Sequence, residues 1–364
     1  MDYFGQSHSI EPILVNWHKG MKEIAQKIAG VVDKIGIFGA LENLENASNR
    51  LRVLTYHRVS EANEFPHLEP GLISATPAEF REQMTIIKRH YNPIGLSELK
   101  SVHEGGSLPN KAVLVTFDDG YIDFAKHAWP VLRELGIPVL LFVPSDFPAQ
   151  DQHCFWWDRL YSAIANTERD SFEIPDRGEV IIDRKHPRAA YKVARAFVKS
   201  LPHAQAMTWV DSTLEVLGAR QIENHILSWG KLRKLAEEGV VICPHGKTHA
   251  LMTNLTPEEL SLELIESKKH IETEIPNSVG SDVIAYPSNA YNAQVLRAVA
   301  DSNYTFGFGG PRNMVTFPQK PDAQFAINRF AINRFQTGLF RAQLRPSVSR
   351  LGSTFFNLRE RYSA

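Results

Sequence analysis

The chain has 364 residues, and 43% of them are apolar, which is enough to build the core of one barrel-sized domain with insertions. Its formal net charge is −1, so charge gives no case for binding nucleic acid or an acidic polymer, whereas a neutral glycan remains compatible. Neither of its two cysteines fits a disulfide framework, and a reducing compartment is compatible with this composition.

Residues 1–50 are predicted to form an N-terminal helical segment. Apolar residues recur with a helical period between residues 9 and 46 and form one stripe. The stripe predicts packing on the rest of the chain or on a partner subunit, and the alternative is a peripheral membrane contact. The start of the chain lacks the pattern of a secretory signal, and no apolar run is long enough to cross a bilayer. We therefore expect a cytoplasmic protein, with membrane association through 9–46 left open.

From Leu51 onward, strand and helix patterns alternate, which predicts an α/β fold over residues 51–337. A first strand covers residues 51–59. Further segments are then predicted in chain order, with helices at 76–90, 121–135, 231–238, 256–275 and 293–301 and a strand at 138–143.

A buried strand ends in an acidic pair at Val113–Tyr121, which reads VLVTFDDGY. Adjacent residues of an extended chain point to opposite faces, so Asp118 and Asp119 can do different work, one holding a metal ion and the other handling a proton. The alternative is an ordinary strand-ending turn, because aspartate and glycine are common turn residues.

A second polar motif, His245–His249 (HGKTH), follows the short apolar strand at residues 240–243. Two imidazoles four residues apart converge on one ion if the segment makes a single helical turn. Two neutral histidines and one carboxylate are a common ligand set for a hydrolytic metal ion, with positions left for water and substrate. Alone, such a pair is more often structural, but the strand-end acidic pair makes the combination specific.

The two motifs together resemble the polysaccharide deacetylases of the NodB-homology type, carbohydrate esterase family 4. The resemblance spans residues 51–335 and also rests on Leu54–Val59 (LTYHRV), Ala285–Pro287 (AYP) and Ile327–Phe330 (INRF). It implies a distorted (β/α) barrel of that type with a helical insertion. It also implies that Asp118 is the general base and that Asp119, His245 and His249 hold one divalent metal ion, most often zinc and sometimes cobalt or nickel.

The third motif departs from the family pattern. Where the commonest relatives have Arg-x-Pro-Tyr, this chain has Ala-Tyr-Pro-Ser, so the arginine that orients the base is missing at Ala285. A backbone donor at Ser288, beside Tyr286, would still serve an oxyanion. Arg329 follows a β-like run and is our candidate to pair with Asp118, because a buried carboxylate base needs orientation and charge balance.

The family's late Leu-x-x-His motif, which supplies a general acid, has no match in the C-terminal part of the chain. His57 lies at the end of the first predicted strand, and strand ends meet around one mouth in a parallel barrel. We take His57 as the candidate acid, and the alternative is a core or capping histidine.

Residues 150–228 interrupt the alternation with a mostly helical insertion, and such insertions often shape the substrate cleft. Within it, Trp156 could stack on a sugar ring or could anchor the insertion to its domain. Residues 338–364 form a basic tail for which a surface role is expected.

These observations predict a metal-dependent N-deacetylase, a hydrolase of carbon–nitrogen bonds other than peptide bonds. Its expected substrate is an N-acetylated amino sugar in a glycan or in a lipid- or nucleotide-linked precursor. The alternatives are a deformylase or another C–N amide hydrolase on the same fold, and a non-catalytic glycan-binding or scaffold protein.

Overall fold

The computed structural model describes residues 27–28, 30–31, 48–149, 154–332 and 337–344. Nearly all of the N-terminal stripe and most of the basic tail lie outside these residues, so the expectations for them stay predictions. In the described part of the chain, no helix is long and apolar enough to cross a membrane.

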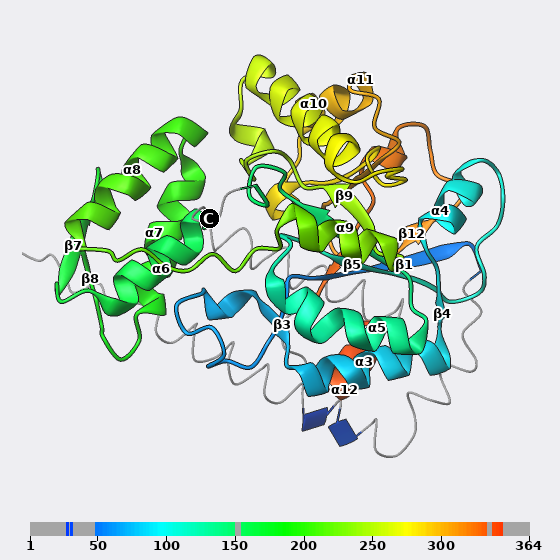
Figure 1. The fold of residues 1–364 in the computed structure, drawn as a ribbon, viewed down its shortest axis with the longest axis horizontal. Coiled ribbons are helices and arrows are strands. Elements are labelled where there is room, and N and C mark those ends of the chain that lie inside the picture. The colour runs from blue at the N-terminus through cyan, green and yellow to red at the C-terminus, as the bar shows by residue number, and fades with distance from the viewer. Residues whose placement is uncertain (1–26, 29, 32–47, 150–153, 333–336, 345–364) are drawn as a thin grey trace, which may run out of the picture.

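A mostly parallel sheet forms the centre of the fold (Figure 1). Its main path pairs, in parallel, β1 (Arg50–Tyr56), β5 (Ala112–Phe117), β6 (Val139–Val143) and β9 (Val241–Pro244). Three short strands extend it, of which β4 (Asn92–Pro93) and β13 (Phe330–Ala331) are parallel and β12 (Val315–Thr316) is antiparallel. Every residue of β5 and β6 is buried, as expected of parallel strands covered on both faces. The predicted α/β fold class with a parallel sheet is confirmed.

The sheet curls into a distorted barrel whose strand ladder is interrupted in two places, and the gap that follows β9 is called the seam. Two further parallel strands, β10 (Val283–Ala285) and β11 (Phe306–Phe308), continue the wall, and Phe308 bridges to Ile327 just before β13. No ladder joins β9 to β10 in the described residues. At the seam, the imidazole Nδ1 of His245 lies 2.8 Å from the carbonyl oxygen of Ala285.

Helices pack around the curled sheet (Figure 1), and buried residues of α3, α5, α9, α10 and α12 belong to one apolar cluster with residues of β1, β5, β6 and β9. Thr76 and Thr256 each cap a helix in a capping box with proline in its first turn, which explains why those helices begin where the sequence predicts. Their bounds are α3 Pro77–His90, α4 Leu96–His103, α5 Trp129–Leu135, α9 Trp229–Glu237, α10 Pro257–Glu274, α11 Ala293–Asp301 and α12 Thr337–Gln343.

The insertion packs as a separate layer beside the barrel and has its own apolar core (Figure 1). It contains α6 (Trp156–Asn166), α7 (Arg188–Ser200) and α8 (His203–Val216). It also contains an antiparallel hairpin of β7 (Ser171–Ile174) and β8 (Gly178–Ile181), which the expectation of a mostly helical insertion did not include. Each hairpin strand has only four residues, which is too few for an alternating pattern to predict a strand clearly.

Candidate metal centre and active site

The acidic pair lies directly after β5, where the chain turns. The N–H of Asp118 still donates to the carbonyl of Tyr56 in β1, at 2.9 Å. Asp119 and Gly120 then take positive φ angles of 74° and 71°. Because Asp119 is left-handed rather than extended, the expectation that the two side chains point to opposite faces is wrong. Both carboxylates approach Nε2 of His245, at 3.8 Å from Asp118 and 3.6 Å from Asp119.

The His245–His249 segment is a loop and not the helical turn that the sequence reasoning assumed. Gly246 and His249 have positive φ angles of 75° and 59°, which no helical turn contains. The loop folds around Glu263 of α10, whose Oε1 accepts the backbone N–H groups of Lys247 and Thr248 at 2.8 Å each. This buried carboxylate, which sequence reasoning missed, takes the place of helical hydrogen bonds and brings the two imidazoles together.

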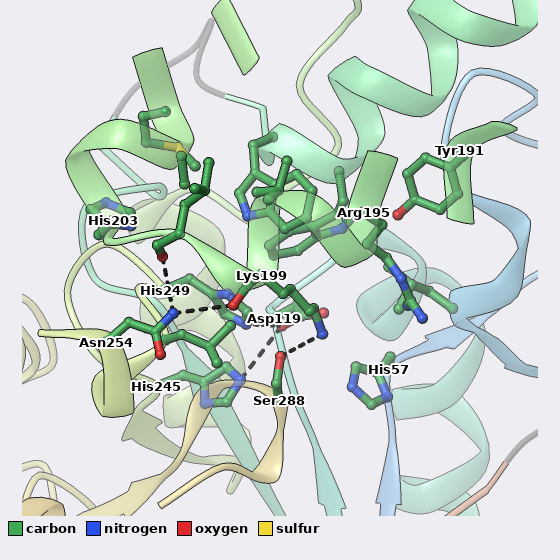
Figure 2. A pocket seen from close by; sticks show the side chains of 18 residues that line it. His57, Asp119, Tyr191, Arg195, Lys199, His203, His245, His249, Asn254 and Ser288 are labelled. Carbon is green, nitrogen blue, oxygen red and sulfur yellow. Dashed lines mark hydrogen bonds and ion pairs between the residues drawn. The ribbon is translucent and has the colours of Figure 1, made fainter. Parts of the chain in front are cut away.

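Asp119, His245 and His249 form a cluster in which one ligand atom from each lies within 4.8 Å of the others (Figure 2). The carbonyl of Ala285 can only accept a hydrogen bond, so Nδ1 of His245 carries the proton and Nε2 presents its lone pair to the cluster. Burial lowers the pKa of His245 to about 4, so the ring is neutral at pH 7.

The carboxylate of Asp119 completes the donor set. Burial raises its pKa, but the nearby imidazoles of His249, His57 and His245 outweigh that effect and bring the pKa to about 2. Its Oδ1 is buried without a hydrogen-bond partner, 3.4 Å from Nε2 of His249 and 3.6 Å from Nε2 of His245. A buried carboxylate oxygen without a hydrogen-bond partner, facing the rings of His245 and His249, is a poor arrangement without a cation, and it fits the ligand set of a divalent metal ion such as zinc.

Asp118 is held by a fully buried arginine. Nη1 of Arg329 donates to Oδ1 of Asp118 at 2.7 Å, and both side chains are 2% exposed or less. Burial raises the pKa of Asp118, but the charge of Arg329, together with the imidazoles of His245 and His57, outweighs it and leaves the pKa below its usual value. Asn289 holds the arginine, because its Oδ1 accepts from Nε and Nη2 of Arg329 at 2.9 and 2.5 Å. Sequence reasoning did not identify Asn289 as part of the site.

His57 lies between β1 and the short strand β2 (Arg58–Val59), so the first predicted strand is interrupted at this residue. Its N–H donates to Oγ of Ser74 at 3.0 Å, and its Nε2 lies 4.0 Å from Oδ2 of Asp118. The side chain is 27% exposed and lines the pocket described next. Its position therefore differs from that of a core histidine.

A cavity of about 200 Å³ opens over the cluster and is shared between the barrel and the insertion (Figure 2). His57, Ser288 and Trp156 line it together with Asp119, His245 and His249. Tyr286 is not brought to this pocket, because its ring is fully buried and its hydroxyl donates to the carbonyl of Phe325 at 2.7 Å. Trp157, the neighbour of Trp156, packs on the ring of His249 with centroids 4.6 Å apart.

Comparison with known proteins agrees with this geometry. The sequence profile of the polysaccharide deacetylase family matches residues 203–307, which include both histidines of the cluster. A putative polysaccharide deacetylase of Bacillus subtilis is 21% identical over 71% of this chain. The chain resembles the polysaccharide deacetylases. The expected family resemblance is therefore confirmed.

Further relatives bear the names of deacetylases. An Escherichia coli poly-beta-1,6-N-acetyl-D-glucosamine N-deacetylase is 34% identical over 25% of this chain. The matched part of this chain spans 63% of the length of the Bacillus subtilis relative and 13% of the length of the Escherichia coli relative.

Solved structures show the same fold. A Streptococcus pyogenes deacetylase in complex with acetate aligns over 81% of this chain and 97% of its own, with a TM-score of 0.52 and 18% identity. A putative polysaccharide deacetylase from Bacillus anthracis aligns over 82% of this chain and 70% of its own, with a TM-score of 0.52 and 17% identity. The overall fold is thus that of deacetylase structures. The expected class of hydrolase, one that acts on a C–N amide bond, agrees with the names of these relatives.

Proposed function

We propose that the protein is a metal-dependent N-deacetylase that hydrolyses the N-acetyl amide of an amino sugar. The observation that carries this proposal is the unpartnered Oδ1 of Asp119, buried opposite Nε2 of His245 and Nε2 of His249. The names of the relatives, one of them an N-deacetylase of an N-acetylglucosamine polymer, support the choice of substrate class.

Asp119, His245 and His249 would hold the metal ion. When bound, a divalent ion supplies Lewis acidity toward the amide carbonyl and toward water. The neutral imidazole of His245 and the ionised carboxylate of Asp119 are already in the protonation states that metal binding requires.

Asp118 is placed to act as the general base. Because Arg329 occupies Oδ1, the second oxygen, Oδ2, is the one directed toward His245 and His57. The lowered pKa keeps Asp118 ionised at neutral pH, so Oδ2 can accept a proton from the attacking water. Arg329 and Asn289 fix the carboxylate and supply the orientation that the missing arginine at Ala285 gives in the commonest relatives.

His57 is placed to return a proton to the leaving amine. Its side chain lines the cavity, and its Nε2 lies 4.0 Å from Oδ2 of Asp118. Asp118 would therefore accept a proton and His57 would donate one at the same substrate amide. Ser288, which has a φ of 58°, lies in the cavity lining, and its backbone is our candidate donor to the oxyanion.

The first experiment measures metal content and acetate release on the same samples. Elemental mass spectrometry on wild type is expected to find about one ion per chain, which Asp119→Ala and the His245→Ala, His249→Ala double variant lose together with activity. A matched control is the Asp183→Ala, His186→Ala double variant, which removes an exposed aspartate–histidine pair in the insertion and is expected to keep both. If wild type contained no metal ion even after reconstitution, that result would favour the glycan-binding or scaffold alternative.

The preferred acyl group and the role of His57 as general acid are tested with the metal-bound enzyme. Release of formate from an N-formyl sugar in preference to acetate would favour the deformylase alternative. His57→Gln is expected to keep its metal and to lower turnover by about 100-fold, the usual scale of general acid catalysis. Unchanged turnover would place the acid elsewhere. The cytoplasmic location, and with it a lipid- or nucleotide-linked precursor as substrate, stays a prediction.

A further inference from the structure

The two imidazoles of the proposed metal site are held in different ways. The ring of His245 is fixed by its hydrogen bond from Nδ1 to the carbonyl of Ala285. In the part of the chain that the structure describes, no carbonyl accepts a hydrogen bond from the ring of His249, whose Nε2 lies 3.4 Å from Oδ1 of Asp119. A histidine ligand usually has a second partner that fixes its orientation, so another kind of contact must orient His249.

Aromatic side chains of the insertion pack on the ring of His249. The ring centroid of Trp157, in α6, lies 4.6 Å from that of His249, with an angle of 59° between the planes. Phe155, just before α6, stacks on Trp157 with centroids 4.2 Å apart and lies 5.9 Å from His249. Both aromatic side chains are buried. Packing of this kind restricts the rotation of the imidazole, although Trp157 belongs to the insertion and His249 to the barrel.

Trp157 is in turn fixed to the barrel by a chain of hydrogen bonds. Its Nε1 donates to the hydroxyl of Tyr121 at 2.8 Å, and that hydroxyl donates to Oδ2 of Asp158 at 2.6 Å. Oδ1 of Asp158 accepts the backbone N–H of Glu69 at 2.8 Å. Tyr121 and Asp158 are each 1% exposed, and Tyr121 follows Asp119 by two residues. Since a buried network with satisfied partners restricts conformation, the first turn of α6 has a defined position beside the acidic pair.

We propose that Trp157, held by Tyr121 and Asp158, is a positioning residue that orients the imidazole of His249 for a metal ion. This inference rests on the proposed function and deepens it, because it gives the insertion a part in building the metal site as well as in shaping the cavity. Trp157 touches a ligand and not the ion, so its effect is on metal affinity and on the geometry of the ligand set.

The test is a titration with cobalt(II) in the absence of substrate, followed by visible absorption. Trp157→Leu removes the ring and is expected to weaken cobalt binding by about 10- to 100-fold, the usual cost of losing a partner that orients a ligand. At saturating cobalt, its absorption bands are expected to differ from those of wild type, because a reoriented His249 changes the geometry around the ion. Trp157→Phe keeps an aromatic ring and is expected to restore most of the affinity.

Tyr121→Phe tests the same positioning while leaving the ring of Trp157 in place. It removes the hydroxyl that joins Trp157 to Asp158, and we expect cobalt binding about 10-fold weaker than in wild type. Urea unfolding of the same samples checks that each variant is folded. This second variant gives an answer even if Trp157→Leu does not fold.

A matched control is Trp209→Leu, which removes another tryptophan of the insertion. Trp209 packs on Phe197 with centroids 5.0 Å apart and does not line the cavity over the cluster. Its loss is expected to lower stability but to leave cobalt affinity and absorption unchanged. Equal weakening of cobalt binding in this control would overturn the inference, because the effect would then come from the stability of the insertion. Wild-type affinity and absorption in both Trp157→Leu and Tyr121→Phe would also overturn it.

Measuring acetate release beside the titration separates this inference from the proposed function. Weaker cobalt binding in the Trp157 and Tyr121 variants would support the positioning role even if wild type released no acetate, a result that would count against the deacetylase alone. Normal acetate release by wild type, with variants that bind cobalt as wild type does, would remove the positioning role and leave the deacetylase. A wild type that binds no cobalt would contradict both.

Discussion

Replacement of Glu263 by alanine tests what stabilises the His245–His249 loop, which is proposed to bind the metal ion. This side chain of α10 is 5% exposed and accepts the N–H groups of Lys247 and Thr248 at Oε1, each at 2.8 Å. Its Oε2 accepts the hydroxyl of Thr248 at 3.1 Å. Glu263→Ala removes both acceptor oxygens and leaves the backbone N–H groups of Lys247 and Thr248 without these hydrogen-bond partners.

The magnitude follows from the number of donors left without a partner. A buried backbone N–H without an acceptor costs about 1–3 kcal/mol, so losing two lowers the free energy of unfolding by about 2–6 kcal/mol. Glu263→Gln is the matched control, because its amide oxygen can still accept both N–H groups. The amide nitrogen of that variant replaces only Oε2, so we expect a loss of about 1 kcal/mol.

Metal affinity is expected to fall with stability. The loop contains left-handed backbone at Gly246 and His249, and Glu263 is what holds that conformation. Loss of a partner that orients a ligand typically weakens metal binding by about 10- to 100-fold. The assays are urea unfolding of the metal-free protein and zinc titration against a chelating dye. If Glu263→Ala unfolded at the wild-type midpoint and bound zinc as tightly, the role assigned to Glu263 would be refuted.

Three further outcomes follow from the structure. Arg329→Met leaves Asp118 buried without its cation, and we expect a loss of about 3–5 kcal/mol in unfolding free energy and at least about 100-fold in acetate release. An unchanged metal content by elemental analysis distinguishes this effect from loss of the ion. Gly280→Ala places a Cβ 2.6 Å from a backbone oxygen of β9. We expect about 1–3 kcal/mol of destabilisation by thermal unfolding, whereas Gly230→Ala, whose Cβ has no neighbour closer than 4.0 Å, is expected to be neutral or stabilising. Burial raises the pKa of Asp158 to about 7, so its contribution to stability is full below about pH 4 and is lost as pH rises through 7. Wild type should therefore lose on the order of a few kcal/mol relative to Asp158→Asn between pH 4 and 8, and parallel stability curves for the two proteins would contradict this.

The sequence identified the parts of the site that are determined locally. Asp118 and Asp119 follow an apolar strand that can be read directly, and Thr76 and Thr256 with their prolines mark helix starts. Arg329, 211 residues from Asp118 in sequence, was found by asking which cation could balance a buried carboxylate. That argument works only because burying an unpaired charge costs so much free energy that Asp118 must have a cationic partner.

The parts that sequence reasoning missed depend on contacts between distant segments. Glu263 looks like any charged residue of an amphipathic helix, and nothing in its neighbourhood shows that a loop 15 residues earlier folds around it. Asn289 lies beside a helix cap, which is an adequate explanation for a polar residue until Arg329 is seen to donate to it. The left-handed backbone of Asp119 reverses the alternation that an extended strand predicts, because local periodicity assumes the strand continues.

The hydrogen bond between His245 and the carbonyl of Ala285, at the seam of the barrel, also determines whether His245 releases a proton when an ion binds. The carbonyl of Ala285 keeps the one ring proton of His245 on Nδ1, and burial lowers the pKa of the imidazole from 6.5 to about 4. Nε2 is therefore already deprotonated throughout the neutral range, and binding an ion there releases no proton from this residue. An exposed histidine of ordinary pKa would compete with hydrogen ions below about pH 6.5. The seam thus keeps Nε2 of His245 available to a cation in mildly acidic solution.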